Sequence, residues 1–179
     1  MNAVVDLERV RLELKARKGY RNWVSRFRED FGLTTRLDHI SIEALRFLGQ
    51  GKGDNSFYIY DLIMNLQGLG SGFEFNELSA KDKMAVMERY LFLLDRIRFE
   101  YMKRLGWLES YPGEEFTLVE LITRFDLIAP GMQARPPLLC KDHPEYEIFC
   151  KMNLFEKEEF IRKLVPEAIK EIQGHSTTL

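Results

Sequence analysis

The side chains best suited to metal binding or nucleophilic chemistry are Cys140, His143 and Cys150, which lie close together in the sequence. Their spacing, C-x2-H-x6-C, is not a standard zinc pattern, and a structural zinc site needs four ligands. A Cys–His nucleophile would also need an oxyanion hole, which this spacing does not show. We therefore predict no metal and no cofactor, with Cys150 on the core face of a helix and Cys140 in a loop.

Two pairs of acidic residues have the spacing of one helix face: Glu156 with Glu159, and Glu167 with Glu171. Carboxylates hold metal ions in helical bundles when they project inward from facing helices. Both pairs lie outside the apolar stripe of their own segment, so we expect them on a solvated face and not at a metal site.

Two glycine-rich loops, at 49–56 and 68–76, invite comparison with phosphate-binding loops. A Walker A loop needs Gly-Lys followed by Ser or Thr, whereas Gly53 follows Lys52 here. A dinucleotide-binding loop would need glycine where Asp54 stands. We interpret both loops as connections between helices, and the sequence leaves open whether they have a function.

Two arginines, Arg98 and Arg135, are the candidates for binding a small ligand. Arg98 is in line with Leu94 and Tyr101 on a helical face, so its guanidinium must reach solvent or pair with a carboxylate. Arg135 lies in residues 127–142, which we name the strap. Prolines and a glycine predict that the strap is irregular, and its apolar residues predict that it is ordered over the core. These breakers are Pro130, Gly131, Pro136 and Pro137.

Residues 1–36 have more basic than acidic side chains and interleaved aromatic residues, as some nucleic-acid-binding surfaces do. On a continuous helix, five cations could share a face that contacts phosphates. They are Arg11, Lys15, Lys18, Arg21 and Arg28. The aromatic residues have helical spacing, which predicts an inward-facing stripe and not a platform for stacking bases. They are Tyr20, Trp23, Phe27 and Phe31.

The longest candidate helix covers residues 79–108. Ser79 is a suitable N-cap, and no proline or glycine follows until Gly106. Apolar residues recur in two neighbouring stripes, which predicts a helix that others cover around most of its circumference. The stripes are Met87, Leu91, Leu94, Tyr101, Leu105 and Leu108, and Val86, Tyr90, Leu93 and Ile97. Phe92 and Phe99 are expected towards the opposite side.

Shorter helices are predicted around this central one. Residues 3–31 have two helical phases, with a break at Gly19 and a stop at Gly32. Further helices are predicted at 38–48, 56–67, 117–125 and 154–173, with a short one that has Pro144 in its first turn. Pro166 should kink or restart the last helix.

The chain of 179 residues has a net charge of −2, two cysteines and no apolar run of membrane-spanning length. Its start shows no signal peptide, so we expect a cytoplasmic protein. We predict an all-α fold with a single domain at 1–174 and a frayed tail at 175–179. The domain is expected to be an irregular or orthogonal bundle of six to eight helices around a central helix at about 79–107.

The leading functional hypothesis is a non-enzymatic protein–protein interaction module that binds a protein partner or forms a homodimer. It depends on the absence of catalytic motifs and on an aromatic content of 12%. One alternative is a nucleic-acid-associated protein that uses the basic N-terminal helices. The other is a small-ligand-binding protein or enzyme with its site under the strap. No residue is predicted to be catalytic.

Overall fold

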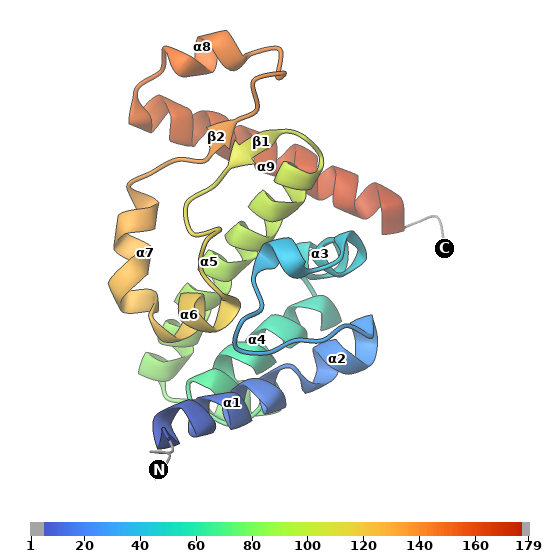
Figure 1. Cartoon of the computed structure of the whole chain (residues 1–179), viewed down its shortest axis with the longest axis vertical. Coiled ribbons are helices and arrows are strands. Elements are labelled where there is room, and N and C mark those ends of the chain that lie inside the picture. The colour runs from blue at the N-terminus through green and yellow to red at the C-terminus, as the bar shows by residue number, and fades with distance from the viewer. Residues whose placement is uncertain (1–5, 177–179) are drawn as a thin grey trace, which may run out of the picture.

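The computed structural model describes residues 6–176 and is predominantly helical (Figure 1). Its α-helices are α1 (Leu7–Gly19), α2 (Arg21–Phe27), α3 (Ile42–Gly49), α4 (Asp54–Leu66), α5 (Ala80–Arg104), α6 (Leu118–Thr123), α7 (Phe125–Gln133), α8 (Tyr146–Cys150) and α9 (Leu154–Ser176). The 3-10 helices are η1 (Leu37–His39) and η2 (Gly72–Glu77), and the strands are β1 (Leu108–Ser110) and β2 (Leu138–Leu139). The predicted all-α fold is confirmed, with nine α-helices within residues 6–176 in place of six to eight.

Helix α5 runs through the middle of the molecule, as predicted, and contacts α3, α4, α6 and α9 (Figure 1). It begins after Ser79, whose hydroxyl accepts a hydrogen bond from the backbone N–H of Asp82 at 3.2 Å. This cap satisfies one of the amides that the first turn of a helix leaves without a partner. The helix ends at Arg104, and Gly106 follows with a φ of 82°, which L side chains rarely adopt.

The buried face of α5 differs from the predicted one. Met87 and Leu91, which were expected in a buried stripe, are 46% and 57% exposed. Phe92, expected towards the opposite side, is buried against Phe125 of α7, with ring centroids 5.3 Å apart. The stripe that contains Leu93 is buried as predicted. The difference arises because α6 and α7 fold back along the Phe92 side, and periodicity within α5 cannot indicate which neighbours will cover it.

The N-terminal segment forms two helices that meet at Tyr20, close to the predicted break. Helix α1 packs on α4, and both Tyr20 and Trp23 are buried, as their spacing predicted. Helix α2 ends at Phe27, where Arg28 adopts a left-handed conformation with a φ of 55°. The predicted end at Gly32 is therefore too late, because the chain turns at a residue other than glycine.

Helices extend into both predicted glycine-rich loops. The predicted helix after the first loop is confirmed, and it begins early, at Asp54, while η2 begins at Gly72 inside the second loop. The buried Asp61 carboxylate of α4 accepts a hydrogen bond from the Gly72 N–H at 2.8 Å. A Cβ at position 72 would lie 2.8 Å from the Phe57 ring, so glycine permits this approach of η2 to α4.

The chain after β1 has more regular structure than predicted. Thr117 and Glu120 form the predicted capping box at the start of α6, with hydrogen bonds of 2.9 and 3.1 Å. Helix α7 then continues through Pro130, so the prediction of an irregular strap is wrong for this part. Proline removes one backbone hydrogen bond, and the burial of Ala129 and Met132 in the core offsets that loss.

The strap therefore begins inside α7 and passes through β2. Strand β2 pairs antiparallel with β1, with Leu139 opposite Leu108. Both leucines are buried in the smaller of two apolar clusters, together with Phe149 of α8 and Ile161 of α9. Since β1 closely follows α5, this pairing holds the end of the strap beside the central helix.

Helix α9 crosses the molecule on the side away from α1 and α2 (Figure 1). It passes through Pro166 as one element. The predicted inward stripe of Ile161, Ala168 and Ile172 is buried. The helix extends past the predicted start of the tail at 175 and reaches Ser176, while 177–179 lie outside the described residues. The assignment of 1–174 to a single domain stays a prediction.

The short helix α8 begins at Tyr146, so Pro144 precedes it and does not occupy its first turn. Phe149 is the side chain that α8 buries. The predicted core position of Cys150 is wrong, because Cys150 is exposed. A helix of about one turn can direct few side chains inward, and here the aromatic ring takes that position.

A buried carboxylate, Glu100, joins α5 to two other segments. It accepts hydrogen bonds from Nε of Arg104 at 2.9 Å and from the hydroxyl of Tyr111 at 2.8 Å. Nη2 of Arg104 also donates to backbone carbonyls around η1. These carbonyls belong to Leu37, Asp38 and Ile40. A buried charge needs partners of this kind, because it loses the hydration that it has in the unfolded chain.

Removal of the hydroxyl group should change the stability of the fold in different directions at two buried tyrosines, Tyr111 and Tyr20. Tyr111→Phe should destabilise the fold by about 1.5–3 kcal/mol, because Glu100 loses a donor. Tyr20→Phe should be neutral or stabilise by about 1 kcal/mol, because the Tyr20 hydroxyl is buried without a hydrogen bond to any described residue. Urea unfolding measures both free energies. Equal destabilisation by the two substitutions would contradict the assigned hydrogen bonding.

Candidate ligand-binding site

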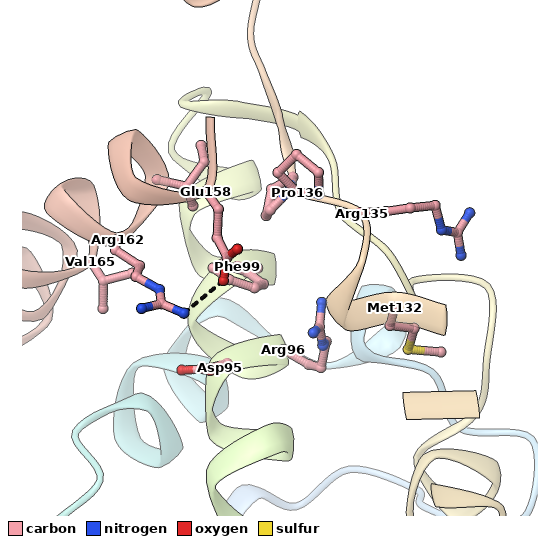
Figure 2. A pocket seen from close by; sticks show the side chains of 11 residues that line it. Asp95, Arg96, Phe99, Met132, Arg135, Pro136, Glu158, Arg162 and Val165 are labelled. Atoms are coloured by element: carbon pink, nitrogen blue, oxygen red, sulfur yellow. Dashed lines mark hydrogen bonds and ion pairs between the residues drawn. The ribbon is translucent and has the colours of Figure 1, made fainter. Parts of the chain in front are cut away.

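A cavity of about 440 Å³ lies between α5, the strap and α9, and we name it the strap cavity (Figure 2). Three segments that are far apart in the sequence form its walls. They contribute Asp95, Arg96 and Phe99 from α5, Met132, Arg135, Pro136 and Pro137 from α7 and the strap, and Glu158, Ile161, Arg162 and Val165 from α9. Its volume falls in the range of small-molecule sites.

The local sequence of each wall explains how it faces the cavity. On α9, the cavity residues Glu158, Ile161, Arg162 and Val165 recur at intervals of three and four and so share one helix face. Ile161 and Met132 are each only 2% exposed and give the cavity an apolar lining between its charged groups.

Arg96 is the charged group at the centre of this site. Its residue is 6% exposed, and its guanidinium extends from α5 towards Pro136 of the strap (Figure 2). The rings of Phe92 and Phe99 lie 4.6 and 5.2 Å from the guanidinium carbon. Burial lowers the pKa of Arg96 to about 10, against partial compensation by the charge of Asp95.

The guanidinium of Arg96 is poorly satisfied. Nη1 donates to the carbonyl of Pro112 at 2.8 Å. Nε is buried without a hydrogen-bond partner, and within residues 6–176 no carboxylate oxygen lies within 4.0 Å to form an ion pair. A buried charge with one neutral acceptor is costly, because the interior does not replace its lost hydration.

Arg89, about two turns earlier on α5, is a buried arginine in which each guanidinium nitrogen donates a hydrogen bond. It is 7% exposed, and its guanidinium lies 4.9 Å from the Phe125 ring. Nε donates to Ile122 O at 3.2 Å, Nη1 to Ala85 O at 3.1 Å and Nη2 to the Asp126 carboxylate at 3.1 Å. The two arginines therefore have similar burial and similar aromatic contacts, and they differ in how many of their donors are used.

Two carboxylates share the cavity with Arg96. Glu158 pairs with Arg162 at 2.6 Å on α9 (Figure 2). Asp95 stays open to solvent, but the protein packed around it removes part of its hydration. This desolvation raises the pKa of Asp95, and the charges of Arg96, Arg98 and Arg162 lower it in part. The site thus holds groups of both signs that can orient a charged ligand.

The structure separates the two predicted ligand-binding arginines. Arg135 lines the strap cavity at its edge, where it is exposed, and its guanidinium points away from the other cavity residues (Figure 2). Arg98 does not line the cavity. Its Nε donates to Gly49 O at 2.9 Å, at the C-terminus of α3, and burial lowers its pKa. A cation at this position interacts favourably with the helix dipole, so Arg98 has a structural role there.

The five basic residues predicted to contact nucleic acid all lie on the surface, four of them on α1 and α2 and Arg28 directly after α2. Arg11, Lys15, Lys18, Arg21 and Arg28 are exposed, and none of their side chains forms an ion pair or hydrogen bond with a described residue. Their role in nucleic-acid binding stays a prediction. The aromatic residues Tyr20 and Trp23 are buried, so they cannot stack with bases.

The described cysteine and histidine side chains are not gathered into a metal site. Among the side chains that the structure describes, which do not include that of His175, no three His, Cys, Asp or Glu side chains lie together as metal ligands would. Cys140 is half-buried, Cys150 is exposed, and Nδ1 of His143 accepts a hydrogen bond from the Glu145 N–H at 3.1 Å.

No family model, curated protein or solved structure matches the chain. No family therefore assigns a role to Arg96 or to another cavity residue. None of the helices described for residues 6–176 is both long enough and apolar enough to span a bilayer.

Arg96 is the cavity residue that sequence reasoning missed. A signal was available: Phe92 and Phe99 lie four residues before it and three after it, so a helix brings both rings to its side chain. A cation between two aromatic residues at this spacing indicates an arginine that can be buried through ring contacts. No local pattern indicates that α7 and α9 enclose it.

Replacing each buried arginine by methionine should change the free energy of unfolding by different amounts, because Arg89 has more hydrogen-bond partners than Arg96. Arg89→Met should destabilise the fold by about 3 kcal/mol, because it removes three hydrogen bonds and leaves Ile122 O with only the longer hydrogen bond from Nε2 of Gln67, at 3.4 Å. Arg96→Met should change stability by less than about 1 kcal/mol, because the cost of burying its charge disappears with its single hydrogen bond. Denaturant unfolding of both variants tests this, and a larger loss for Arg96→Met would contradict the assignment.

Proposed function

We propose that this protein binds a small molecule in the strap cavity. The single observation that carries the proposal is the position of Arg96, a buried and largely unpartnered guanidinium inside a cavity of about 440 Å³. Ligand sites combine apolar walls with a few convergent polar groups, and the cavity has both. Its charged groups are guanidinium and carboxylate groups, which hold and orient ligands, so we propose binding without chemical conversion.

The proposal selects one of the alternatives that the sequence left open, the ligand site under the strap. In this site α5 contributes Arg96, α9 contributes four lining residues, and Arg135 stands at the edge. The strap and α9 are far apart in the sequence, so the cavity between them exists in the folded chain and not in the unfolded one. A ligand that binds there therefore stabilises the fold by mass action.

Filling the cavity should abolish ligand binding. Val165→Phe places a larger side chain in the cavity wall on α9, so fragments that bind wild-type protein should lose at least tenfold in affinity. Ligand-observed NMR with a library of small charged and neutral fragments measures this. Lys163→Phe, on the exposed part of the same helix, is the matched control and should leave affinities unchanged. A library that yields no fragment sensitive to Val165→Phe would refute the proposal.

A second candidate function is protein–protein interaction, the leading hypothesis from the sequence, and we now propose α1 as the interacting surface. Leu7, Val10 and Leu14 recur at intervals of three and four on this helix and are 62%, 40% and 50% exposed. The first turn of α1 is acidic at Glu8 and its last turn is basic. Two copies packed antiparallel would therefore bring opposite charges together beside the apolar stripe, which favours a homodimer. The cytoplasmic location stays a prediction.

The homodimer predicts that charge in the α1 stripe disrupts association. Val10→Glu combined with Leu14→Glu should weaken dimerisation at least tenfold, because carboxylates would be buried against apolar groups. Analytical ultracentrifugation over a range of concentrations measures the dissociation constant. Leu127→Glu, on the exposed face of α7, is the control. A wild-type chain that stays monomeric at high concentration would rule out this candidate.

A further inference from the structure

The ligand class follows from the edge of the Arg96 guanidinium that the protein leaves unused. Nη1 is occupied by Pro112 O, whereas neither Nε nor Nη2 donates to a described residue. Nε is covered by protein, so Nη2 is the donor of this edge that a ligand carboxylate can reach without a shift of its surroundings. Arg89 uses the equivalent donors for Ile122 O and Asp126, so the fold can satisfy such an edge internally and does not do so at Arg96.

We propose that the natural ligand of the strap cavity is an organic monoanion, whose carboxylate group pairs with Arg96 and whose apolar body lies against Phe99, Met132 and Ile161. This inference rests on the proposed function and adds to it the chemical class of the ligand. The carboxylate replaces the acceptors that Arg96 lacks, and the apolar body covers walls that are already held in place by the core.

The charge of the cavity sets the charge of the ligand. Three arginines and two acids line the cavity, which leaves one positive charge at neutral pH. Glu158 is already paired with Arg162, so the uncompensated charge belongs to the Arg96 and Arg135 side. A single negative charge balances it.

The acids also discriminate against ligands of higher charge. A phosphate monoester carries close to two negative charges at neutral pH, and the second charge would lie near Asp95 and Glu158. Like charges in a partly desolvated site repel strongly, because water screens them less than it does at the surface. We therefore infer a carboxylate and not a phosphate.

Three matched probes test the class on the wild-type protein. 3-Phenylpropionate carries the carboxylate on an apolar body, 3-phenylpropionamide has the same shape without charge, and phenyl phosphate has a dianionic head. Isothermal titration calorimetry should show the carboxylate binding at least tenfold more tightly than either of the others. Equal or tighter binding of the amide would overturn the monoanion and leave the cavity as a ligand site. Tighter binding of phenyl phosphate would overturn the choice of carboxylate.

Substitution of Arg96 tests the contact. Arg96→Met should reduce carboxylate affinity roughly ten- to a hundredfold while leaving amide affinity unchanged. Lys163→Met is the control, because Lys163 is an exposed cation on α9 that does not line the cavity, and it should change carboxylate affinity by less than about threefold. Arg96→Lys keeps the charge but not the planar guanidinium that carries Nη2, and it should give an intermediate loss.

The outcomes separate this inference from the proposed function. Carboxylate affinity that is unchanged in both Arg96→Met and Arg96→Lys would overturn the inference. If 3-phenylpropionate does not bind at millimolar concentration while neutral fragments still respond to Val165→Phe, the inference fails and the proposed function stands. If no fragment responds to Val165→Phe, the proposed function fails as well. The probe comparison uses the unmodified chain, so it remains decisive if a variant does not fold.

Discussion

The burial of charge along α5 is the constraint on which the rest of the structure depends. Arg89, Arg96 and Glu100 lie on the part of the helix that α6, α7 and the segment after β1 cover. A helix that is enclosed with charges on its covered side is stable only when the covering segments supply hydrogen-bond partners. Ile122 O and Asp126 do this for Arg89, and Tyr111 and Arg104 do it for Glu100.

Arg96 is the member of this set whose compensation is incomplete. Two aromatic rings and one carbonyl hold it, and the rings replace only part of the hydration that its charge loses. Nε is covered by protein without an acceptor, and the strap cavity opens beside the same side chain. In this structure, incomplete satisfaction and open space occur at the same place, as is expected of a site prepared for a ligand.

The cavity itself is a consequence of how the strap is anchored. One end of the strap is the last turn of α7, fixed by the buried side chains of Ala129 and Met132. The other end is β2, fixed by its pairing with β1 beside α5. Between these anchors the chain crosses α5 without packing against all of it, and α9 supplies the remaining wall. Pro136 and Pro137, which lie between the two anchors, limit the conformations of that span.

The sequence by itself determined the class and the segmentation of the fold. The caps at Ser79 and Thr117, the long uninterrupted stretch of α5 and the buried spacing on α9 are local signals, because they act between residues within one or two turns. Only the tertiary structure decided which face of α5 is buried, that α7 continues through Pro130, and that Arg96 and not Arg98 faces a cavity. Those outcomes depend on segments far apart in the chain, and the energy of burying a charge is set by whichever neighbours arrive around it.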